Sequence, residues 1–175
     1  MDNVADQSGR QPSARPGASG TQPGSDTAST VGTIVDEVAF DVERGKIAEF
    51  ARATDARDAV HTDRREAERR HLPDVAATAT HVVVAGHHRS AQSMLETLGL
   101  DLPRVMVGGT SWDYVRPLVA GDSLTGRRIV TGDVTKKSSS SGSPLRILTL
   151  ETVYRDRDGQ VAVRQQETIL ERGRR

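Results

Sequence analysis

The sequence predicts an α+β fold in which an antiparallel β-sheet wraps around one long central α-helix, and two observations lead to this prediction. The stretch 77–98 carries apolar residues at helical spacing, which indicates a helix with most of one side buried. The chain after Arg104 has the alternation and the turn residues of several β-strands. Because one long buried helix followed by several strands needs a sheet curved around it, the expected arrangement is the hot-dog fold.

The expected central helix has both a buried face and a stop. Gly99 follows the last apolar position, where a left-handed cap residue is common, and Pro103 comes soon after. We therefore expect one continuous helix over residues 77–98. Its buried stripe consists of Val84, Ala91, Leu95 and Leu98 with His81 and His88, widened by Val83 and Met94.

Length and composition limit the class of protein. The chain has 175 residues with 24 basic and 24 acidic side chains, so it has no global electrostatic attraction to nucleic acid or to a membrane surface. The absence of cysteine excludes a disulfide framework and a cysteine nucleophile. No apolar run approaches the roughly 20 residues needed to span a bilayer. These features predict a soluble protein without nucleic-acid or membrane partners.

The first 30 residues differ in composition from the rest of the chain. They consist largely of Gly, Ser, Pro, Ala and Thr, and they lack the apolar core of a secretory signal. We expect a disordered tail over residues 1–30, one folded domain over residues 31–175, and a cytoplasmic location.

Four segments precede the central helix. Residues 34–42 alternate in the manner of a strand, and residues 44–53 have the spacing of a short amphipathic helix. Residues 54–62 follow neither period and are expected to form an Asp-rich loop that holds His61. Residues 63–71 are almost wholly charged, which favours a solvated helical turn. Their four arginines leave open a second interpretation, a docking patch for an acidic carrier protein or a cofactor phosphate.

The strands after the central helix are separated by clear turn signals. Gly108 and Gly109 in the first of them indicate a bulge or a close backbone approach. A polar loop at 136–144 and a hairpin signal at 156–159 separate the later strands. The expected strands are residues 104–114, 124–134, 145–154 and 161–170.

Several common catalytic and binding motifs are absent from the sequence. It has no Gly-x-Gly-x-x-Gly, no P-loop and no Gly-x-Ser-x-Gly, so dinucleotide binding, phosphoryl transfer and a serine-hydrolase triad have no motif support. On a helix, His81 and His88 would lie two turns apart, about 10 Å, which is too far for both to bind one metal ion. We therefore expect no cofactor and no metal site, and we interpret these histidines as packed or hydrogen-bonded beside the core.

Two stretches of the chain resemble the N-terminal domain of MaoC-like dehydratases. Residues 40–54, Phe-Asp-Val-Glu-Arg-Gly-Lys-Ile-Ala-Glu-Phe-Ala-Arg-Ala-Thr, resemble the opening of that domain. Residues 115–124, Val-Arg-Pro-Leu-Val-Ala-Gly-Asp-Ser-Leu, resemble its aromatic-x-x-Pro, x-x-Gly-Asp signature. Residues 77–81, Ala-Thr-Ala-Thr-His, stand where the family usually carries Ala-Pro-Pro-Thr-Phe. The similarity extends over most of the chain outside the tail, from Val31 to Gly173.

This resemblance implies a hot-dog protein that works as a homodimer or as a heterodimer with a catalytic hot-dog subunit. The implied substrates are acyl chains carried as thioesters on coenzyme A or acyl carrier protein, and the implied reaction is reversible dehydration of a (3R)-3-hydroxyacyl thioester. That reaction needs a base at C2, an acid for the C3 hydroxyl and donors for the thioester oxygen. In catalytic members of the family, a Gly-Asp-x-Asn-Pro-x-His loop supplies the Asp and the His. The start of the central helix supplies backbone N–H donors.

Alignment with that loop places His61 in its histidine slot, Asp58 in its asparagine slot and Ala56 in its aspartate slot. The resemblance thus implies His61, with Asp55 or Asp58, as the candidate catalytic residues. The departure at Ala56 is closest to the non-catalytic partner subunits of heterodimeric dehydratases, whereas the histidine favours an active chain. Each residue also has a plainer interpretation, as a loop histidine bonded to backbone or as an aspartate that stabilises a turn.

Four further residues are candidates for substrate binding. Thr78 and Ala79 stand at the expected start of the central helix, Trp112 lies in a strand, and Arg116 is able to hold a carboxylate or phosphate. Trp112 is equally consistent with packing against the helix or a dimer interface, and Arg116 with an ordinary surface position.

Two other functions remain open. A hot-dog acyl-thioesterase would use a carboxylate facing the central helix to activate water, and the sequence has no Asp or Glu between Thr78 and Ala91. A non-catalytic module would hold the acyl chain without reaction. The departure at Ala56 makes a dehydratase or hydratase subunit with a catalytic partner the first hypothesis.

Overall fold

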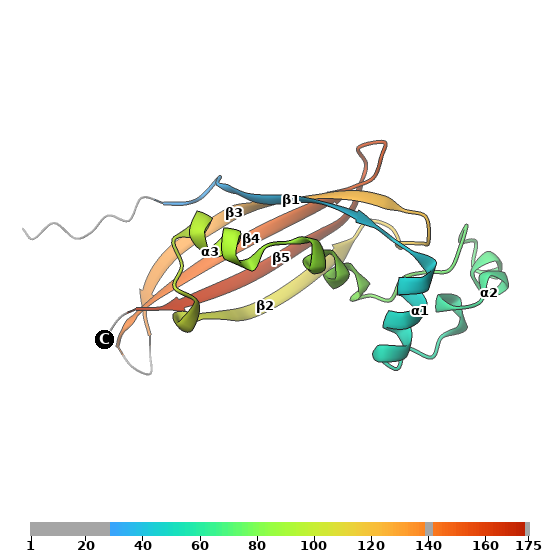
Figure 1. Ribbon diagram of the computed structural model, residues 1–175, viewed down its shortest axis with the longest axis horizontal. Coiled ribbons are helices and arrows are strands. Elements are labelled where there is room, and N and C mark those ends of the chain that lie inside the picture. The colour runs from blue at the N-terminus through green and yellow to red at the C-terminus, as the bar shows by residue number, and fades with distance from the viewer. Residues whose placement is uncertain (1–28, 139–141, 174–175) are drawn as a thin grey trace, which may run out of the picture.

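The computed structural model describes residues 29–138 and 142–173, and its centre is a five-stranded antiparallel sheet (Figure 1). The strands are β1 (Ile34–Asp41), β2 (Val105–Tyr114), β3 (Ser123–Lys137), β4 (Pro144–Arg155) and β5 (Val161–Arg172). They lie in the order β1-β3-β4-β5-β2, so β1 and β2 form the two edges of the sheet.

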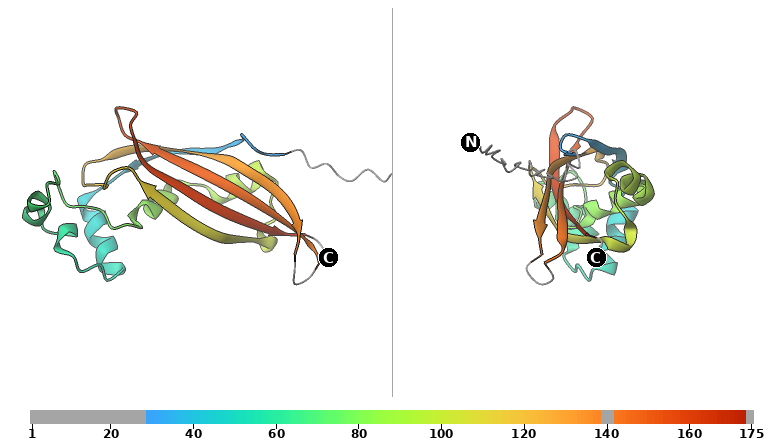
Figure 2. Two further views of the ribbon diagram at one scale, coloured as in Figure 1. Left: turned by 180° about the vertical axis from the view of Figure 1, so that it is seen from behind. Right: turned by 90° about the vertical axis from the view of Figure 1, so that its left-hand side faces the viewer.

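The helical segments lie on one face of this sheet and beyond one of its ends. They are α1 (Arg44–Ala53), η1 (Ala59–His61), α2 (Arg64–Arg69), η2 (His81–His88), α3 (Ala91–Leu98) and η3 (Leu102–Arg104), where η denotes a 3₁₀ segment. Segments η2 and α3 cross the inner face of the sheet, whereas α1, η1 and α2 project past its end (Figures 1 and 2). The opposite face of the sheet carries no helix among the described residues (Figure 2). None of the helices in these ranges is long and apolar enough to cross a membrane.

Most of the elements expected from the sequence are present. Helix α1 spans the predicted residues 44–53, and the side chain of Asp63 caps α2. The four strands expected after Arg104 are β2 to β5, each within a few residues of its predicted bounds. The register of β2 against β5 shifts between Val107 and Gly109, which confirms the bulge. Gly159, with φ of 77°, lies in the hairpin between β4 and β5.

The tail predicted over residues 1–30 falls mostly outside the described residues, which begin at Ser29. Thr30 is described and is bonded to the sheet. Its N–H and its hydroxyl donate to the Asp133 carboxylate (3.1 and 2.7 Å), which also accepts hydrogen bonds from Arg146.

The prediction of one continuous helix over residues 77–98 is wrong. The first part, η2, is a 3₁₀ segment, and the chain becomes extended at Arg89 (φ −105°, ψ 147°). Helix α3 then starts anew, with the Ser90 hydroxyl accepting a hydrogen bond from the Ser93 N–H (3.2 Å). A left-handed Gly99 (φ 63°) ends it as expected.

The 3₁₀ geometry of η2 also changes the buried face of this segment. His81, Val82 and Ala85 are fully buried, in keeping with the three-residue period of a 3₁₀ helix. Leu98 is buried as expected, and Val84, Met94 and Leu95 are half-buried. The members of the predicted face that the structure leaves exposed are Val83, His88 and Ala91.

The core consists of three apolar clusters, of which two lie on the helical side of the sheet and the third, formed by Val60, Ala67 and Ala76, lies near η1 and α2. The first, near α1 and η2, is called the α1-side cluster: Phe40, Val42, Ile47, Val75, Val82, Ala85, Leu118, Leu124, Tyr154, Ala162 and Val163. The second, under α3, is called the α3-side cluster: Val35, Leu98, Val130, Leu148, Leu150 and Ile169.

Candidate functional site

The loop between α1 and α2 holds the three candidate catalytic residues. Helix α1 is capped by Thr54, and Asp55 then adopts a left-handed backbone conformation (φ 53°) that turns the chain away from the helix. Asp58 caps the short turn η1 by accepting a hydrogen bond from the Val60 N–H (3.1 Å). This cap places His61 at the end of η1.

His61 is held by the backbone that leads into η2. Its Nδ1 lies 2.7 Å from the carbonyl oxygen of Ala76. Because a carbonyl oxygen only accepts, Nδ1 carries a proton, and in the neutral imidazole Nε2 therefore keeps its lone pair. The Ala76 N–H donates to the Val60 carbonyl (3.0 Å), and Ala76 pairs with Val119 in an isolated bridge. The ring of His61 is thus oriented by a backbone segment that is itself fixed on two sides.

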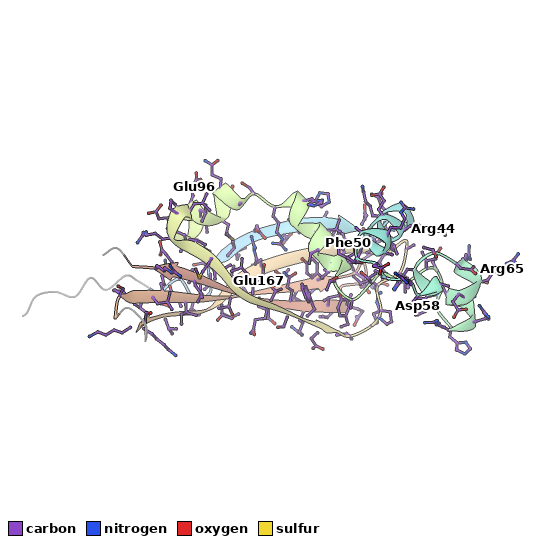
Figure 3. All side chains as sticks on the ribbon, turned by 90° about the horizontal axis from the view of Figure 1, so that it is seen from below. Arg44, Phe50, Asp58, Arg65, Glu96 and Glu167 are labelled. Carbon is purple, nitrogen blue, oxygen red and sulfur yellow. The ribbon has the colours of Figure 1, made fainter. Side chains whose placement is uncertain are left out.

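The Asp58 carboxylate is occupied by Arg70. The guanidinium donates to both of its oxygens (2.8 and 2.9 Å). The hydrogen bond from Arg70, followed by that from the Val60 N–H, holds the pKa of Asp58 below its usual range. Asp58 lies at the end of the molecule that carries α2, away from the middle of the sheet (Figure 3). Because its pKa is lowered, Asp58 is an anion at neutral pH. The structure gives no hydrogen bond between Asp58 and His61.

Asp55 and Ala56 complete the loop. The Asp55 side chain is 76% exposed and accepts two hydrogen bonds from Arg57 (2.9 and 3.0 Å). Ala56 is half-buried, and its N–H donates to the Ala51 carbonyl (2.8 Å). A methyl group thus stands where the resemblance expects an aspartate. Within the described ranges, the structure leaves His61 without a carboxylate partner.

A cavity of 420 Å³ lies where the chain enters η2, and we call it the entry cavity. Its lining includes Thr78, Ala79, Tyr114 and Arg116. The Thr78 hydroxyl is buried and has no hydrogen-bond partner in the described part of the chain. The Tyr114 hydroxyl donates to the Ala79 carbonyl (2.7 Å), and burial raises the pKa of Tyr114 to about 12. Three of the four predicted substrate-binding residues therefore share one cavity.

The backbone N–H groups at the start of η2 are not all free. The His81 N–H donates to the Thr78 carbonyl (3.0 Å), and the Val83 N–H donates to the Thr80 carbonyl (3.1 Å). The resemblance implied free donors here, but a 3₁₀ helix closes its hydrogen bonds one residue earlier than an α-helix. The buried Thr78 hydroxyl remains available as a donor in the wall of the entry cavity.

Arg116 is held by carboxylates of its own chain. It donates to both oxygens of Asp122 (2.8 and 3.0 Å) and to Asp156 (3.3 Å). The hydrogen bond with Asp122 is the main cause that raises the pKa of Arg116. Since Asp122 also accepts from the Val119 N–H (2.9 Å), Arg116 fixes the turn before β3. Its role in binding a substrate stays a prediction.

A second cavity of 330 Å³ lies between the sheet and the η2–α3 segment, and we call it the groove cavity. Of the four predicted substrate-binding residues, Trp112 lines it. Its charged residues are Arg89 after η2, Arg128 on β3 and Glu167 on β5, and none of them was predicted from the sequence. Glu167 is labelled in Figure 3. A signal was present, because the inward-facing positions of β3 recur at every second residue and Arg128 is one of them.

Sequence relatives share most of the length of this chain. The family model of the FAS1-like dehydratase domain region matches residues 29–165. A UPF0336 protein of Clavibacter michiganensis is 36% identical over 133 residues, which cover 75% of this chain and 85% of the relative.

Solved structures of low sequence identity share the fold. The HadBC (3R-hydroxyacyl-ACP dehydratase) complex of Mycobacterium tuberculosis has a TM-score of 0.66 at 18% identity, covering 82% of this chain and 98% of that chain. The (R)-hydratase of A. caviae has a TM-score of 0.58 at 21% identity, and the match covers 82% of this chain and 97% of the hydratase. These likenesses show the hot-dog fold. Because the family model spans most of the sequence, the chain belongs to the family of the FAS1-like dehydratase domain region.

Proposed function

We propose that the chain is a subunit of a (3R)-3-hydroxyacyl-thioester dehydratase, which in the reverse direction is an enoyl-thioester hydratase. Membership of the dehydratase-region family supports this class of reaction. Two proteins of similar fold are a 3R-hydroxyacyl-ACP dehydratase complex and an (R)-hydratase, which supports an acyl chain on coenzyme A or acyl carrier protein as the substrate. The proposed setting is the cytoplasm, where such thioesters are made.

The loop between α1 and α2 is the observation that supports catalytic groups from two different chains. Dehydration needs one group to take the C2 proton and another to protonate the C3 hydroxyl. His61 is able to serve as one of them, because Nε2 of its neutral ring keeps a lone pair. Ala56 supplies no second group, and the two aspartates beside it are bound to arginines. We therefore assign the missing carboxylate to a hot-dog partner that carries the complete Gly-Asp-x-Asn-Pro-x-His loop.

The β2 edge is the surface that we assign to this partner. Strand β2 pairs with β5 on one side, and no described strand lies on its other side. Met106 and Val107 on this strand are 39% and 66% exposed. An open edge with exposed apolar side chains is a ready template for pairing with another strand. The solved HadBC structure, which has a similar fold, is itself a complex.

Hydration of a short trans-2-enoyl-CoA, followed as loss of the enoyl absorbance, tests this proposal. The purified chain alone is compared with the chain co-purified with a hot-dog subunit of the same organism that carries the complete loop, and the partner alone is the control. We expect the mixture to be at least about 10²-fold faster than the chain alone, because the chain alone lacks one of the two acid–base groups that the reaction needs.

Three results would contradict the proposal. Fast hydration by the chain alone that is lost in His61→Ala, but not in the exposed control His88→Ala, would identify an autonomous enzyme. Binding of the enoyl thioester without hydration in either preparation would identify a non-catalytic acyl-binding module. Release of free coenzyme A thiol in the same samples would identify a thioesterase.

A further inference from the structure

A row of polar residues crosses the inner face of the sheet. In the strand register, Asp36 lies opposite Arg128, Arg128 opposite Thr152, Thr152 opposite Gln165, and Gln165 opposite Trp112. We call these five residues the polar row, and together they span every strand from β1 to β2. The row separates the α1-side cluster from the α3-side cluster, which an uninterrupted apolar core would have joined.

The charges in and around the polar row balance. Asp36 accepts hydrogen bonds from both Arg89 and Arg128. Arg128 also donates to Glu167 (3.4 Å), and Arg89 donates to the Tyr154 hydroxyl (3.3 Å). Two guanidinium groups therefore meet two carboxylates. A ligand group that brings its own charge would disturb this balance in a poorly hydrated place, whereas an uncharged polar group would not.

Three buried donors of the polar row have no partner within the part of the chain that the structure describes. They are Arg128 Nε, Trp112 Nε1 and the Thr152 hydroxyl. The guanidinium and indole N–H groups are donors only, and the Arg128 side chain is 7% exposed. A buried donor without an acceptor destabilises a protein, so a row that retains several of them is suited to a ligand that supplies the acceptor.

The groove cavity lies directly over the polar row. Its lining includes Arg128, Trp112 and Gln165 from the row, and Val82 and Met94 form part of its apolar wall. Since one water molecule takes about 30 Å³ in the liquid, the cavity of 330 Å³ has room for roughly ten groups of that size. This space suits a segment of chain with both methylene groups and an oxygen.

We propose that the groove cavity binds an uncharged oxygen group, a hydroxyl or a carbonyl, carried on the acyl chain far from its thioester. The oxygen would accept hydrogen bonds from Trp112 Nε1 and Arg128 Nε, and the preceding methylene groups would lie along Val82 and Met94. This inference rests on the proposed function, and it places the thioester at the entry cavity, whose lining includes the predicted substrate-binding residues Thr78 and Ala79. Eight residues of 3₁₀ helix at about 2.0 Å each place Arg89 about 16 Å from the start of η2, so the oxygen belongs near the distal end of a long chain.

Isothermal titration of the purified full-length chain, in the oligomeric form in which it is isolated, tests this inference by binding rather than by turnover. The probes are dodecanoyl-CoA, 12-hydroxydodecanoyl-CoA and the corresponding diacid, dodecanedioyl-CoA. We expect the hydroxylated thioester to bind at least about tenfold more tightly than the alkyl one, because the alkyl chain leaves the buried donors unpaired. The diacid should gain no such advantage, since its carboxylate would lose its hydration among groups whose charges already balance.

Two variants and a matched control test which side chains cause the preference for the hydroxylated thioester over the alkyl one. Trp112→Phe keeps an aromatic ring but removes the N–H, and it should reduce the preference for the hydroxylated thioester to within about threefold. Arg128→Leu should do the same. Arg127→Leu, at the exposed neighbouring position of β3, should leave the preference unchanged. If Arg128→Leu fails to fold, the preference measured for Trp112→Phe alone tests the inference.

The outcomes separate this inference from the proposed function. Equal binding of the hydroxylated and alkyl thioesters by the native chain would overturn the inference and leave the proposed function standing. Failure to bind any of the three thioesters would overturn both. A preference that survives in Trp112→Phe and Arg128→Leu would place the oxygen elsewhere and would also overturn the inference.

Discussion

His81 is a buried histidine whose ring nitrogens have no hydrogen-bond partner among the described residues. Its ring lies 6.0 Å from that of Phe40 and 5.3 Å from that of Phe50, in the position where MaoC-like domains usually carry phenylalanine. We expect His81→Phe to raise the free energy of unfolding by about 1–2 kcal/mol at neutral pH, because it removes unsatisfied polar atoms from an apolar site. Urea denaturation measures the change, and the exposed substitution His88→Gln should leave it near zero.

The same residue should make stability depend on pH. Burial lowers the pKa of His81 from its usual value of 6.5. As the pH falls below 6.5, the unfolded chain takes up a proton at this position before the folded chain does, so the free energy of unfolding decreases. Denaturation midpoints on either side of pH 6.5 should therefore differ less in His81→Phe than in the native chain. If acidification lowered the free energy of unfolding equally in the two proteins, groups other than His81 would be the cause.

A substitution at Ala56 tests whether the chain needs a partner only because it lacks a carboxylate at this position. Ala56→Asp would restore the spacing Asp-x-x-x-x-His with His61. We expect this single change to raise enoyl-CoA hydration by the chain alone by about 10²-fold, since one general acid or base contributes on that scale. The matched control Ala56→Asn, of similar size but without the acid–base group, should stay inactive, and adding His61→Ala should abolish the gain. A folded Ala56→Asp chain without any gain would mean that this loop cannot assemble the catalytic pair.

At the scale of single residues, the sequence suggests candidate positions but not their hydrogen-bond partners. His61, Thr78 and Ala79 are candidates because the resemblance assigns them slots along the chain, Trp112 is a candidate from its place in a strand, and the roles of all four stay predictions. The pairing of Asp58 with Arg70 joins residues 12 positions apart, and that of Asp36 with Arg128 joins residues 92 positions apart. Such pairs depend on how elements pack, which no local spacing encodes.

At the scale of elements, the strands were predictable and the central helix was not. Strands β3 and β4 alternate strictly between buried and less buried positions over much of their length, so a period of two is easy to recognise. Residues 77–98 have apolar residues that satisfy a period of 3.6, but η2 has a period of three. Gly86 weakens a helix at this point, and Arg89, where the chain becomes extended, donates a hydrogen bond to Asp36 on β1. The break thus coincides with a tertiary contact that no local spacing encodes.

Gly126 on β3 leaves room for the ring of Tyr154 on the neighbouring strand β4, and a substitution there tests how tightly the two residues pack. It lies opposite Tyr154, and a Cβ atom at this position would come within 2.5 Å of Tyr154 Cε1. The ring cannot move away freely, because it is buried and its hydroxyl donates to Gln165 (3.2 Å). We expect Gly126→Ala to lower the free energy of unfolding by about 1–3 kcal/mol. Gly109→Ala is the control, since a Cβ there meets no atom within 4 Å, and equal effects of the two changes would contradict this account.

At the scale of the whole molecule, the sheet has one inner face covered by helical segments and two strands at its edges (Figure 2). A single sheet around one helix leaves its outer strands unpaired on one side, so an open edge is expected of this fold. Which edge is suited to a partner became visible only in the structure. Most of β2 is exposed, whereas β1 has three buried residues among eight. Strand β2 also borders both the entry cavity and the groove cavity, so a chain paired there would adjoin both.

Pairing along β2 predicts that a single charge on that strand dissociates the dimer. Val107 is 66% exposed on β2, and Val107→Asp would place a carboxylate in the proposed interface, where it would be desolvated without a partner. Without the catalytic partner, the same edge is free to pair with a second copy of this chain, so we expect light scattering after size exclusion to show a dimer for the native chain and a monomer for Val107→Asp. Val134→Asp is the matched control, because Val134 is also exposed (49%) but lies on β3, opposite Ile147 of β4 and outside the proposed interface, and this variant should remain dimeric. Trp112, the one tryptophan of the chain, lies on β2, so its fluorescence should change on dilution of the native protein and not of Val107→Asp. A Val107→Asp chain that stays dimeric would place the interface on another surface.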